Sequence, residues 1–331
     1  MLTICIPTYN RNNLLYQCLL RLLPQLRENH QLLLIDNCSN TPIKDSIGGL
    51  LDQFNISQDC IVRNSVNIGG AGNILRCLEL CETQWMYCLG DDDLVSPGCI
   101  ESIEKVIATH VDAIYISFNR AHSLRLTEVR TEGMRAFIDQ LYDWSSFLFM
   151  SAVVVNAERM RAHIRWGNLY SYSWAPLQAI LIKMLNSGGA VIFSEAIICS
   201  KESLAEGSWV PFPVAAGKMI LPELVEDKAL QSKLARRLMA QPTLTSLIYW
   251  ARASSVDSAV LARNSLFVKL YLERCEYYVG TLRLWPFKLG AFVLLNPRLL
   301  PNWLFRLVEN IIHKVLDRPV PGQREMSDSR T

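Results

Sequence analysis

The sequence predicts an α/β protein with a doubly wound, mostly parallel sheet, followed by a helical region. Three observations support this fold class. Short apolar runs alternate with helical patterns over the first 120 residues, which is typical of βαβ units. Each apolar run ends in a polar motif. From about residue 217 onward the pattern is helical, without an obvious strand. We therefore expect a catalytic domain over residues 1–215 and a helical region over residues 216–331.

Short apolar runs bounded by turn-forming residues mark the strands. The strands expected in the first 120 residues are 2–6, 31–35, 60–62, 85–89 and 113–118. Further along, residues 151–155 and 190–198 are also expected to be strands, with a helix over 176–185 between them. Between the first two strands, Leu15, Cys18, Leu19 and Leu22 recur at helical spacing, and Pro24 bends or ends that helix.

The composition excludes several classes of protein. Hydrophobic residues are 50% of the 331 and charged residues 19%, which is too apolar for a disordered chain. Thirty-three basic residues against 31 acidic ones give a net charge of +2, so we expect no general nucleic-acid binding. No apolar run is long enough to span a membrane, and residues 1–10 do not resemble a secretory signal. Most of the ten cysteines lie in apolar runs, which favours reduced thiols in the cytoplasm.

The polar motifs follow separate strands. They are residues 7–11, 36–39, 67–73 and 90–93. In a doubly wound sheet, ligands bind beyond the carboxyl ends of the strands. We therefore expect all four motifs to meet at one edge of the sheet.

The motif Gly90-Asp91-Asp92-Asp93 is the sharpest of the four. Three adjacent carboxylates after a buried strand repel one another, and a divalent cation would relieve that repulsion. Mn²⁺ and Mg²⁺ prefer oxygen ligands, so either ion fits. If the chain stays extended, Asp91 and Asp93 point the same way and both serve as metal ligands. The alternative is a capping cluster for the helix that begins near Pro97.

Two further motifs suit an anionic ligand. The stretch 67–73 combines a glycine-rich backbone with a helix N-terminus, although glycine before a helix is often only a turn. Asp36 ends a buried strand, where it could accept a hydrogen bond from a base or a ribose hydroxyl. Its alternative role is to cap the polar turn over residues 37–39.

Taken in order, the motifs resemble the signatures of family-2 glycosyltransferases with the GT-A fold. The matching stretches are Cys5-Ile-Pro-Thr-Tyr-Asn-Arg11, Ile35-Asp36-Asn37-Cys38-Ser39, Asn67-x-Gly-x-x-x-Asn73 and Leu89-Gly-Asp-Asp-Asp93. The resemblance covers residues 1–120 closely and 120–200 loosely. It implies an enzyme with a site for a nucleotide-sugar donor, whose nucleotide could be CDP, UDP, dTDP or GDP.

The resemblance also implies roles for single residues. It implies that the nucleotide pocket is lined by Pro7, Thr8, Tyr9 and Arg11. Asp36 would hold the base or ribose, Asp91 would lie near the ribose and the metal, and Asp93 would bind the Mn²⁺ or Mg²⁺ that bridges the diphosphate. The rest of the donor site would come from Asn67, Gly70, Asn73 and Asp92.

The sequence departs from the family pattern at the catalytic base. The family usually carries a Glu-Asp pair before the helix that follows the acceptor region, whereas residues 170–176 contain no carboxylate. The remaining candidates are Glu158, Glu195, Glu202 and His163. Each also fits a surface or turn residue, so the base stays unassigned and both inverting and retaining outcomes stay open.

The last part of the chain interleaves aromatic and basic side chains. Residues 281–318 hold six basic residues against two acidic ones, and prolines cut them into pieces too short to span a bilayer. Such a segment is typical of a surface lying on an anionic leaflet, so we expect peripheral association with the inner face of the cell membrane. A packed helical tail or a dimer contact is the alternative.

The acidic motif, the length and this tail also resemble bacterial O-antigen and capsule glycosyltransferases, and within them abequosyltransferase-like enzymes. That resemblance implies transfer of a 3,6-dideoxyhexose to an undecaprenyl-diphosphate-linked oligosaccharide in lipopolysaccharide biosynthesis. Two other functions stay open. A nucleotidyltransferase would need a glycine-rich loop after the first strand, and residues 6–11 hold no glycine. A non-catalytic, membrane-associated sugar-binding assembly protein is the other.

Overall fold

The computed structural model describes the chain except for residues 120–124, 142–146, 204–210, 240–257, 281–287 and 289–331. The chain forms two compact units. The first comprises residues 1–210 and 220–237, and the second comprises residues 211–219 and 238–331. The domain boundary at 215/216 stays a prediction, and the aromatic and basic segment 281–318 lies outside the described residues except for Lys288.

An eight-stranded sheet forms the centre of the first unit, in the order β3-β2-β1-β4-β8-β6-β9-β7. Its strands are β1 (Leu2–Thr8), β2 (His30–Asp36), β3 (Ile61–Arg63), β4 (Trp85–Cys88), β6 (Ala113–Asn119), β7 (Val129–Glu132), β8 (Val153–Asn156) and β9 (Ala190–Ile197). The four strands from β3 to β4 are parallel, and so are β6 and β9. Only β8 and β7 run antiparallel to their neighbours. The predicted α/β fold with a mostly parallel sheet is therefore confirmed.

A separate two-stranded ribbon joins β5 (Asp93–Val95) to β10 (Cys199–Ser203) in antiparallel register. The sequence analysis did not predict β5, because three residues after an acidic turn carry no periodic signal. This ribbon brings β10, which follows the last strand of the large sheet in the chain, beside the acidic motif. Ser203 of β10 lies opposite Asp93.

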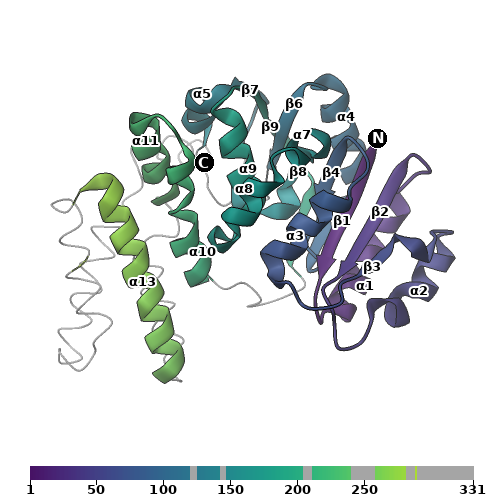
Figure 1. The fold of residues 1–331 in the computed structure, drawn as a ribbon. Helices are drawn as coiled ribbons and strands as arrows, with labels where there is room; N and C mark the ends of the chain where they lie inside the picture. The colour runs from purple at the N-terminus through teal and green to yellow at the C-terminus, as the bar shows by residue number, and fades with distance from the viewer. Residues whose placement is uncertain (120–124, 142–146, 204–210, 240–257, 281–287, 289–331) are drawn as a thin grey trace, which may run out of the picture. The chain divides into compact units, whose positions relative to one another are not determined.

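Helices cover both faces of the sheet. They are α1 (Asn12–Leu22), α2 (Ile43–Gln53), α3 (Gly69–Leu80), α4 (Cys99–Thr109), α5 (Gly133–Gln140), α7 (Ala157–Arg161), α8 (Ile164–Leu169) and α9 (Pro176–Leu185). A further helix, α11 (Lys228–Met239), carries Lys233, which pairs with Asp139 of α5. Short 3₁₀ turns connect them: η1 (Leu23–Gln25), η2 (Gln58–Cys60), η3 (Met150–Ala152), η4 (Ser171–Ser173) and η5 (Leu221–Leu224). Figure 1 shows α3, α8 and α9 together on one face of the sheet.

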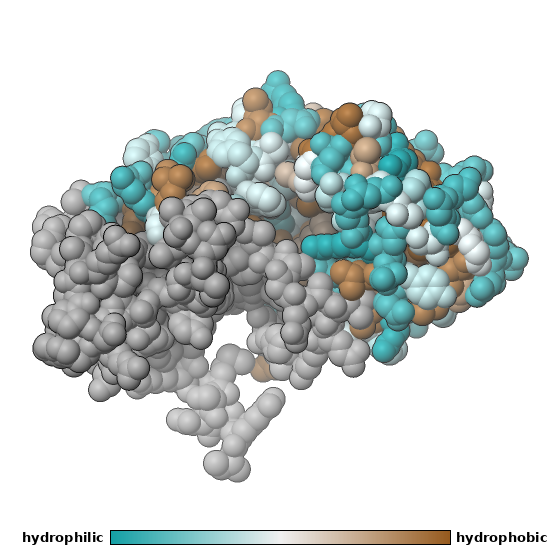
Figure 2. Space-filling view, turned by 90° about the horizontal axis from the view of Figure 1, so that it is seen from below, coloured by the Kyte–Doolittle hydropathy of each residue, from teal (hydrophilic) through white to brown (hydrophobic). Residues whose placement is uncertain are grey.

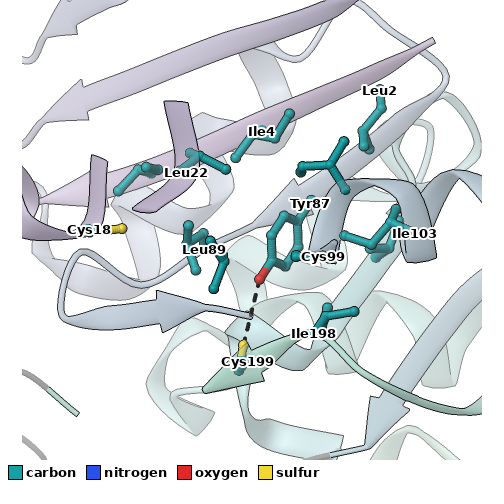
Figure 3. Close-up of a cluster of buried hydrophobic side chains, with 14 of the residues drawn as sticks. Leu2, Ile4, Cys18, Leu22, Tyr87, Leu89, Cys99, Ile103, Ile198 and Cys199 are labelled. Carbon is teal, nitrogen blue, oxygen red and sulfur yellow. Dashed lines mark hydrogen bonds between the residues drawn. The ribbon is translucent and has the colours of Figure 1, made fainter. Parts of the chain in front are cut away.

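Successive side chains of β1 point to opposite faces of the sheet, so β1 contributes to the helix layer on each face. Ile4 points into the core cluster that also contains Leu22 of α1 and Ile103 of α4 (Figure 3). Cys5, the next residue, points to the other face, where its thiol reaches the backbone oxygen of Cys77 in α3. β4, β6 and β8 are buried along their whole length, as expected for strands covered on both faces.

In the second unit, α10 (Pro211–Lys218) packs against α13 (Ser258–Val279). Lys218 is fully buried there, and burial lowers its pKa well below the usual lysine value. Among the helices that the structure describes, none is both long and apolar enough to cross a membrane.

Candidate functional site

The carboxyl ends of β1, β2 and β4 meet at one edge of the sheet. Thr8 and Asp36 are register partners at the ends of β1 and β2. Just beyond β4, the amide of Leu89 donates to the backbone oxygen of Cys5, which continues the pairing toward the acidic motif. In Figure 1, β1 runs downward from the N-terminus, so its carboxyl end lies at the bottom of that view. Figure 2 shows the molecule from below, and hydrophilic residues gather on the part of this face that is coloured. Three predicted motifs thus share this edge.

The acidic motif forms a turn. The amide of Asp93 donates to the backbone oxygen of Gly90 at 3.2 Å. Asp91 and Asp93 were expected to point the same way only if the chain stayed extended, and the structure does not meet that condition. Because the chain turns, Asp91 and Asp92 both reach the guanidinium of Arg11, at 3.0 and 3.2 Å.

Asp91 is the buried member of the motif, with an exposed fraction of 4%. Its two oxygens have separate partners. The Thr8 hydroxyl donates to one at 2.6 Å, and Arg11 donates to the other. Burial raises the pKa of Asp91, and the contributions of Thr8 and Arg11 only partly offset this. Burial lowers the pKa of Arg11, but the neighbouring carboxylates, Asp91 first, outweigh it and leave that pKa raised. Three carboxylates around one guanidinium leave this turn net negative.

Asp93 is held from the side of β8. The hydroxyl of Ser151 donates to Asp93 and accepts the amide of Gly90 at 2.8 Å. Ser151 itself is fully buried, and its backbone oxygen accepts a bond from Tyr87 at 2.9 Å. The sequence analysis did not single out Ser151, because its contact depends on β8 running antiparallel beside β4.

The chemistry of these groups fits a divalent cation. Carboxylate oxygens of Asp91 and Asp93 are ligands that Mn²⁺ and Mg²⁺ prefer. Among the described residues, no group of three or more His, Cys, Asp or Glu side chains is arranged to hold a metal. The turn therefore suits an ion completed by ligand oxygens and water rather than an ion caged by protein alone.

Asp36 is buried at the end of β2 and bonded on both oxygens. It accepts the amide of Ser39 at 2.8 Å and that of Ile43 at 3.4 Å, and it pairs with Arg63. The alternative role of capping the 37–39 turn is thus present in the structure. Burial opposes ionisation, but the hydrogen bonds from Ser39, Arg63 and Ile43 outweigh it and lower the pKa of Asp36.

Four asparagines connect the end of β2 to the start of α3. Asn37 donates to Asn67 at 2.8 Å, and Asn64 donates to Asn37 and Asn73 at 3.0 and 2.9 Å. Asn73 is buried and donates to the backbone oxygen of Ile35 at 3.1 Å, so it fastens α3 to β2. From the sequence, Asn67 and Asn73 were expected in the site and Asn37 appeared only as part of the second motif; Asn64 was missed, since an isolated asparagine after a strand carries no distinct pattern.

The remaining residues that the sequence predicts for a donor site are Pro7, Tyr9 and Gly70. Pro7 is half-buried in β1, and Tyr9 is exposed just beyond it. The amide of Asn10, at a positive φ, donates to Ser39 at 2.9 Å, which ties the first motif to the second. Gly70 lies in the first turn of α3, and a Cβ built on it would meet no atom within 4 Å. The backbone at Gly70 is thus open to a ligand.

The structure separates the candidate bases. Glu158 follows β8, whose last residue pairs with Trp85 at the start of β4, so it lies at the opposite edge from Asp91. Glu195 lies near the carboxyl end of β9, but β6 and β8 separate that strand from β4. His163 precedes α8. The backbone of Glu202 lies in β10, next to the residue opposite Asp93.

Residues 3–152 match a family model described as Glycosyl transferase family 2. The abequosyltransferase RfbV of Salmonella typhimurium is 24% identical over 216 residues, which cover 58% of this chain and 63% of the relative. An uncharacterized glycosyltransferase of Haemophilus influenzae is 26% identical over 116 residues, covering 35% and 37%. The chain thus spans less than two thirds of the length of these curated relatives.

Two solved structures share the fold. The structure of S. aureus TarS 1-349 in complex with UDP-GlcNAc has a TM-score of 0.58 and 12% identity, covering 95% of this chain and 91% of that one. The mannosyltransferase PcManGT from Pyrobaculum calidifontis, in complex with GDP-Man and Mn²⁺, has a TM-score of 0.52 and 12% identity, covering 96% and 88%. At these identities the likeness shows the fold alone, and it confirms the predicted GT-A fold.

Proposed function

Residues 3–152 match the model of glycosyl transferase family 2, and from that premise we propose that this chain is a member which transfers a sugar from a nucleotide-sugar donor with the help of a divalent cation. The observation that carries the proposal is the buried contact of Thr8 and Arg11 with Asp91. It joins the ends of β1 and β4 into one charged turn beside the end of β2, where ligands of doubly wound sheets bind.

The donor would lie across the carboxyl ends of β1 and β2. Pro7, Tyr9 and Asp36 would contact the nucleotide, while Asn67, Gly70 and Asn73 would shape the helix start beside it. TarS and PcManGT were solved with UDP-GlcNAc and with GDP-Man, which supports a nucleoside diphosphate sugar as the donor here. The abequosyltransferase relative supports a 3,6-dideoxyhexose as the sugar.

In the reaction, the bond between the anomeric carbon and the diphosphate oxygen breaks, and an acceptor oxygen forms a new bond to that carbon. Asp93 and Asp91 would hold Mn²⁺ or Mg²⁺, which supplies positive charge that makes the diphosphate a better leaving group. Arg11 would keep Asp91 and Asp92 in place before and after the donor leaves. The acceptor hydroxyl loses its proton to a base. The candidates for that base stay Glu158, Glu195, Glu202 and His163; of these, Glu202 has its backbone in β10, next to the residue opposite Asp93.

The acceptor proposed here is an undecaprenyl-diphosphate-linked oligosaccharide of O-antigen or capsule assembly, at the inner face of the cell membrane. The name of the abequosyltransferase relative and the aromatic and basic composition of residues 281–318 support it. On α13, Leu266, Leu270 and Tyr277 are exposed at spacings of four and seven residues, so they share one helix face. Such a face suits contact with lipid.

Thermal unfolding of the full chain with a panel of CDP-, UDP-, dTDP- and GDP-sugars, with and without Mn²⁺, tests the proposal. A true donor must raise the unfolding temperature by mass action, and the rise should require the metal. Release of the matching nucleoside diphosphate should follow when a lipid-linked acceptor is added. The proposal fails if no nucleotide sugar shifts unfolding, or if chelation of the metal leaves both binding and release unchanged.

A further inference from the structure

A pocket of about 750 Å³ lies along α3, and no residue of the acidic turn lines it. One wall is α3 with the residue before it, from Ile68 to Glu79, and the other is α8 with η4, up to Trp174. Figure 1 shows α8 beside α3, and a Cβ on Gly167 of α8 would come within 2.5 Å of Leu75 of α3. α3 and α8 therefore pack closely at Gly167 and Leu75, and Leu75 also lines the pocket. Its volume lies within the range of roughly 300–1,000 Å³ usual for ligand pockets.

The second wall is aromatic and open to solvent. Tyr172 and Trp174 line the pocket and are 54% and 50% exposed. Tyr172 stacks on Tyr170, with ring centroids 5.9 Å apart, and Tyr170 lies 6.5 Å from Trp166. Trp174 has a φ of +62°, a region that bulky side chains rarely occupy and that is common at ligand sites. The backbone thus holds a large aromatic ring at the rim.

The polar groups of the pocket are neutral as a set. Arg76 and Glu79 pair at 2.8 Å, and Asn168 and Ser171 add an amide and a hydroxyl. Among the residues that the structure describes, no other charged side chain lines this pocket. A phosphate or diphosphate would find no excess positive charge here, so the ligand is expected to be uncharged. Aromatic faces beside planar polar groups suit a sugar ring, whose C–H face is apolar and whose hydroxyls need hydrogen-bond partners.

The pocket adjoins the edge of the sheet where the donor is proposed to bind. Asn67 accepts the amide of Gly69, which lines the pocket, and also accepts a bond from Asn37, the neighbour of Asp36. Cβ atoms built on Gly69 and Gly70 would meet nothing within 4 Å, so the backbone between the two sites is uncovered.

We propose that this pocket binds an uncharged sugar residue of the acceptor glycan, stacked on Tyr172 and Trp174. This rests on the proposed glycosyltransferase function, and it assigns the acceptor rather than the donor to this surface. The acceptor would then be held by its sugar part, with the lipid part lying elsewhere.

Saturation-transfer NMR on the full chain tests the assignment, with methyl glycosides of mannose, galactose and rhamnose as probes and a nucleoside diphosphate with Mn²⁺ present. At least one probe should receive saturation from the protein. Tyr172→Ala and Trp174→Ala should weaken its binding at least about fivefold, whereas Trp174→Phe should retain most of it. Leu169→Ala is the matched control, because Leu169 is 61% exposed at the end of α8, close in sequence to Tyr172, but does not line the pocket.

Donor binding, followed by the metal-dependent thermal shift, should be unchanged in all four variants. If wild-type protein shows that shift but no sugar probe binds, or if the aromatic variants bind like wild type, the acceptor assignment is wrong while the donor function stands. A loss of the shift in wild type itself would instead count against the proposed function. Binding of a dodecyl chain in place of the sugars, abolished by the same substitutions, would also overturn the assignment.

Discussion

Thr8 donates a 2.6 Å hydrogen bond to Asp91, a residue 83 positions further along the chain. The bond joins the first polar motif to the last one at adjacent strand ends. Since Arg11 binds the other oxygen of Asp91, the carboxylate is fixed before any ligand arrives. A charged site that is already organised needs little rearrangement when a charged donor binds.

The first prediction concerns Asp93. Replacing it as Asp93→Asn keeps the shape and an acceptor for Ser151 but removes the charge that a cation needs. We expect the transfer rate to fall by about 10²–10³-fold, together with the metal-dependent thermal shift. Unfolding should change by less than about 1 kcal/mol, because the side chain is part-exposed and its bond to Ser151 persists. Rates measured across an Mn²⁺ titration provide the readout.

The control for Asp93 is Asp112→Asn, which removes a carboxylate that pairs with Arg130 at the surface. It should leave the rate and the metal dependence unchanged. A wild-type rate for Asp93→Asn at every Mn²⁺ concentration would refute the role of Asp93 as a ligand.

The second prediction uses the glycine of the acidic turn. A Cβ on Gly90 would lie 2.6 Å from an oxygen of Asp93 and 3.2 Å from the Ser151 hydroxyl. In Gly90→Ala the flexible Asp93 carboxylate must therefore move away from Ser151. We expect a loss of activity close to that of Asp93→Asn, with a smaller effect on unfolding. Steady-state rates and urea denaturation of the same preparation separate the two effects.

Gly49→Ala gives the matched comparison, since a Cβ there meets nothing within 4 Å and the residue lies inside α2. Alanine in a helix interior should stabilise by roughly 0.5–1 kcal/mol and leave catalysis unaffected. Equal activity in the two variants would show that the position of Asp93 does not matter.

These two predictions rest on contacts that the sequence indicated only in part. Apolar runs located the parallel strands, because strands buried on both faces read as continuous apolar segments. The rule that ligands bind at carboxyl ends then placed Thr8, Asp36 and the acidic motif at one edge. Whether the chain from Asp91 to Asp93 is extended stayed open, because local sequence does not reveal the turn closed by Gly90. Ser151 and Arg63 were missed for a related reason, since each contacts its carboxylate only through strand pairing distant in sequence.

The third prediction is a pH dependence set by Asp36. Its folded pKa lies below the usual value of 3.8, so ionised Asp36 stabilises the fold. That contribution is present above the unfolded pKa of about 3.9 and is lost as the pH falls through the lower folded pKa. Asp36→Asn should therefore be less stable than wild type by about 1–3 kcal/mol at pH 7, because Arg63 loses its carboxylate partner and keeps only its bond to the backbone oxygen of Ser39. The difference should shrink below pH 4.

Urea denaturation at pH 7 and at pH 3.5 measures this change. Asp45→Asn serves as the control, because Asp45 is an exposed carboxylate in the first turn of α2, the helix that follows β2. It should show little difference at either pH. A constant gap between Asp36→Asn and wild type across the acid range would contradict the assignment of the effect to the Asp36 carboxylate.

The fourth prediction addresses membrane association, which rests on the composition of the C-terminal segment. We expect the full chain to sediment with vesicles that contain anionic lipid and to dissociate as salt rises, since each basic residue near the surface contributes about 1 kcal/mol. A variant with Gln at four basic positions should bind these vesicles at least about tenfold more weakly, because it loses the contribution of four charges. The four positions are Arg283, Lys288, Arg298 and Arg306.

The control must change the net charge equally without touching that segment. Four exposed basic residues of the first unit serve this purpose when replaced by Gln: Arg21, Arg27, Lys44 and Lys105. If attraction is local to residues 281–318, only the first set releases the protein, because screening confines each charge to within about 10 Å. Equal release by both sets would mean that overall charge governs binding, and binding to neutral vesicles as strong as to anionic ones would remove the electrostatic part of the proposal.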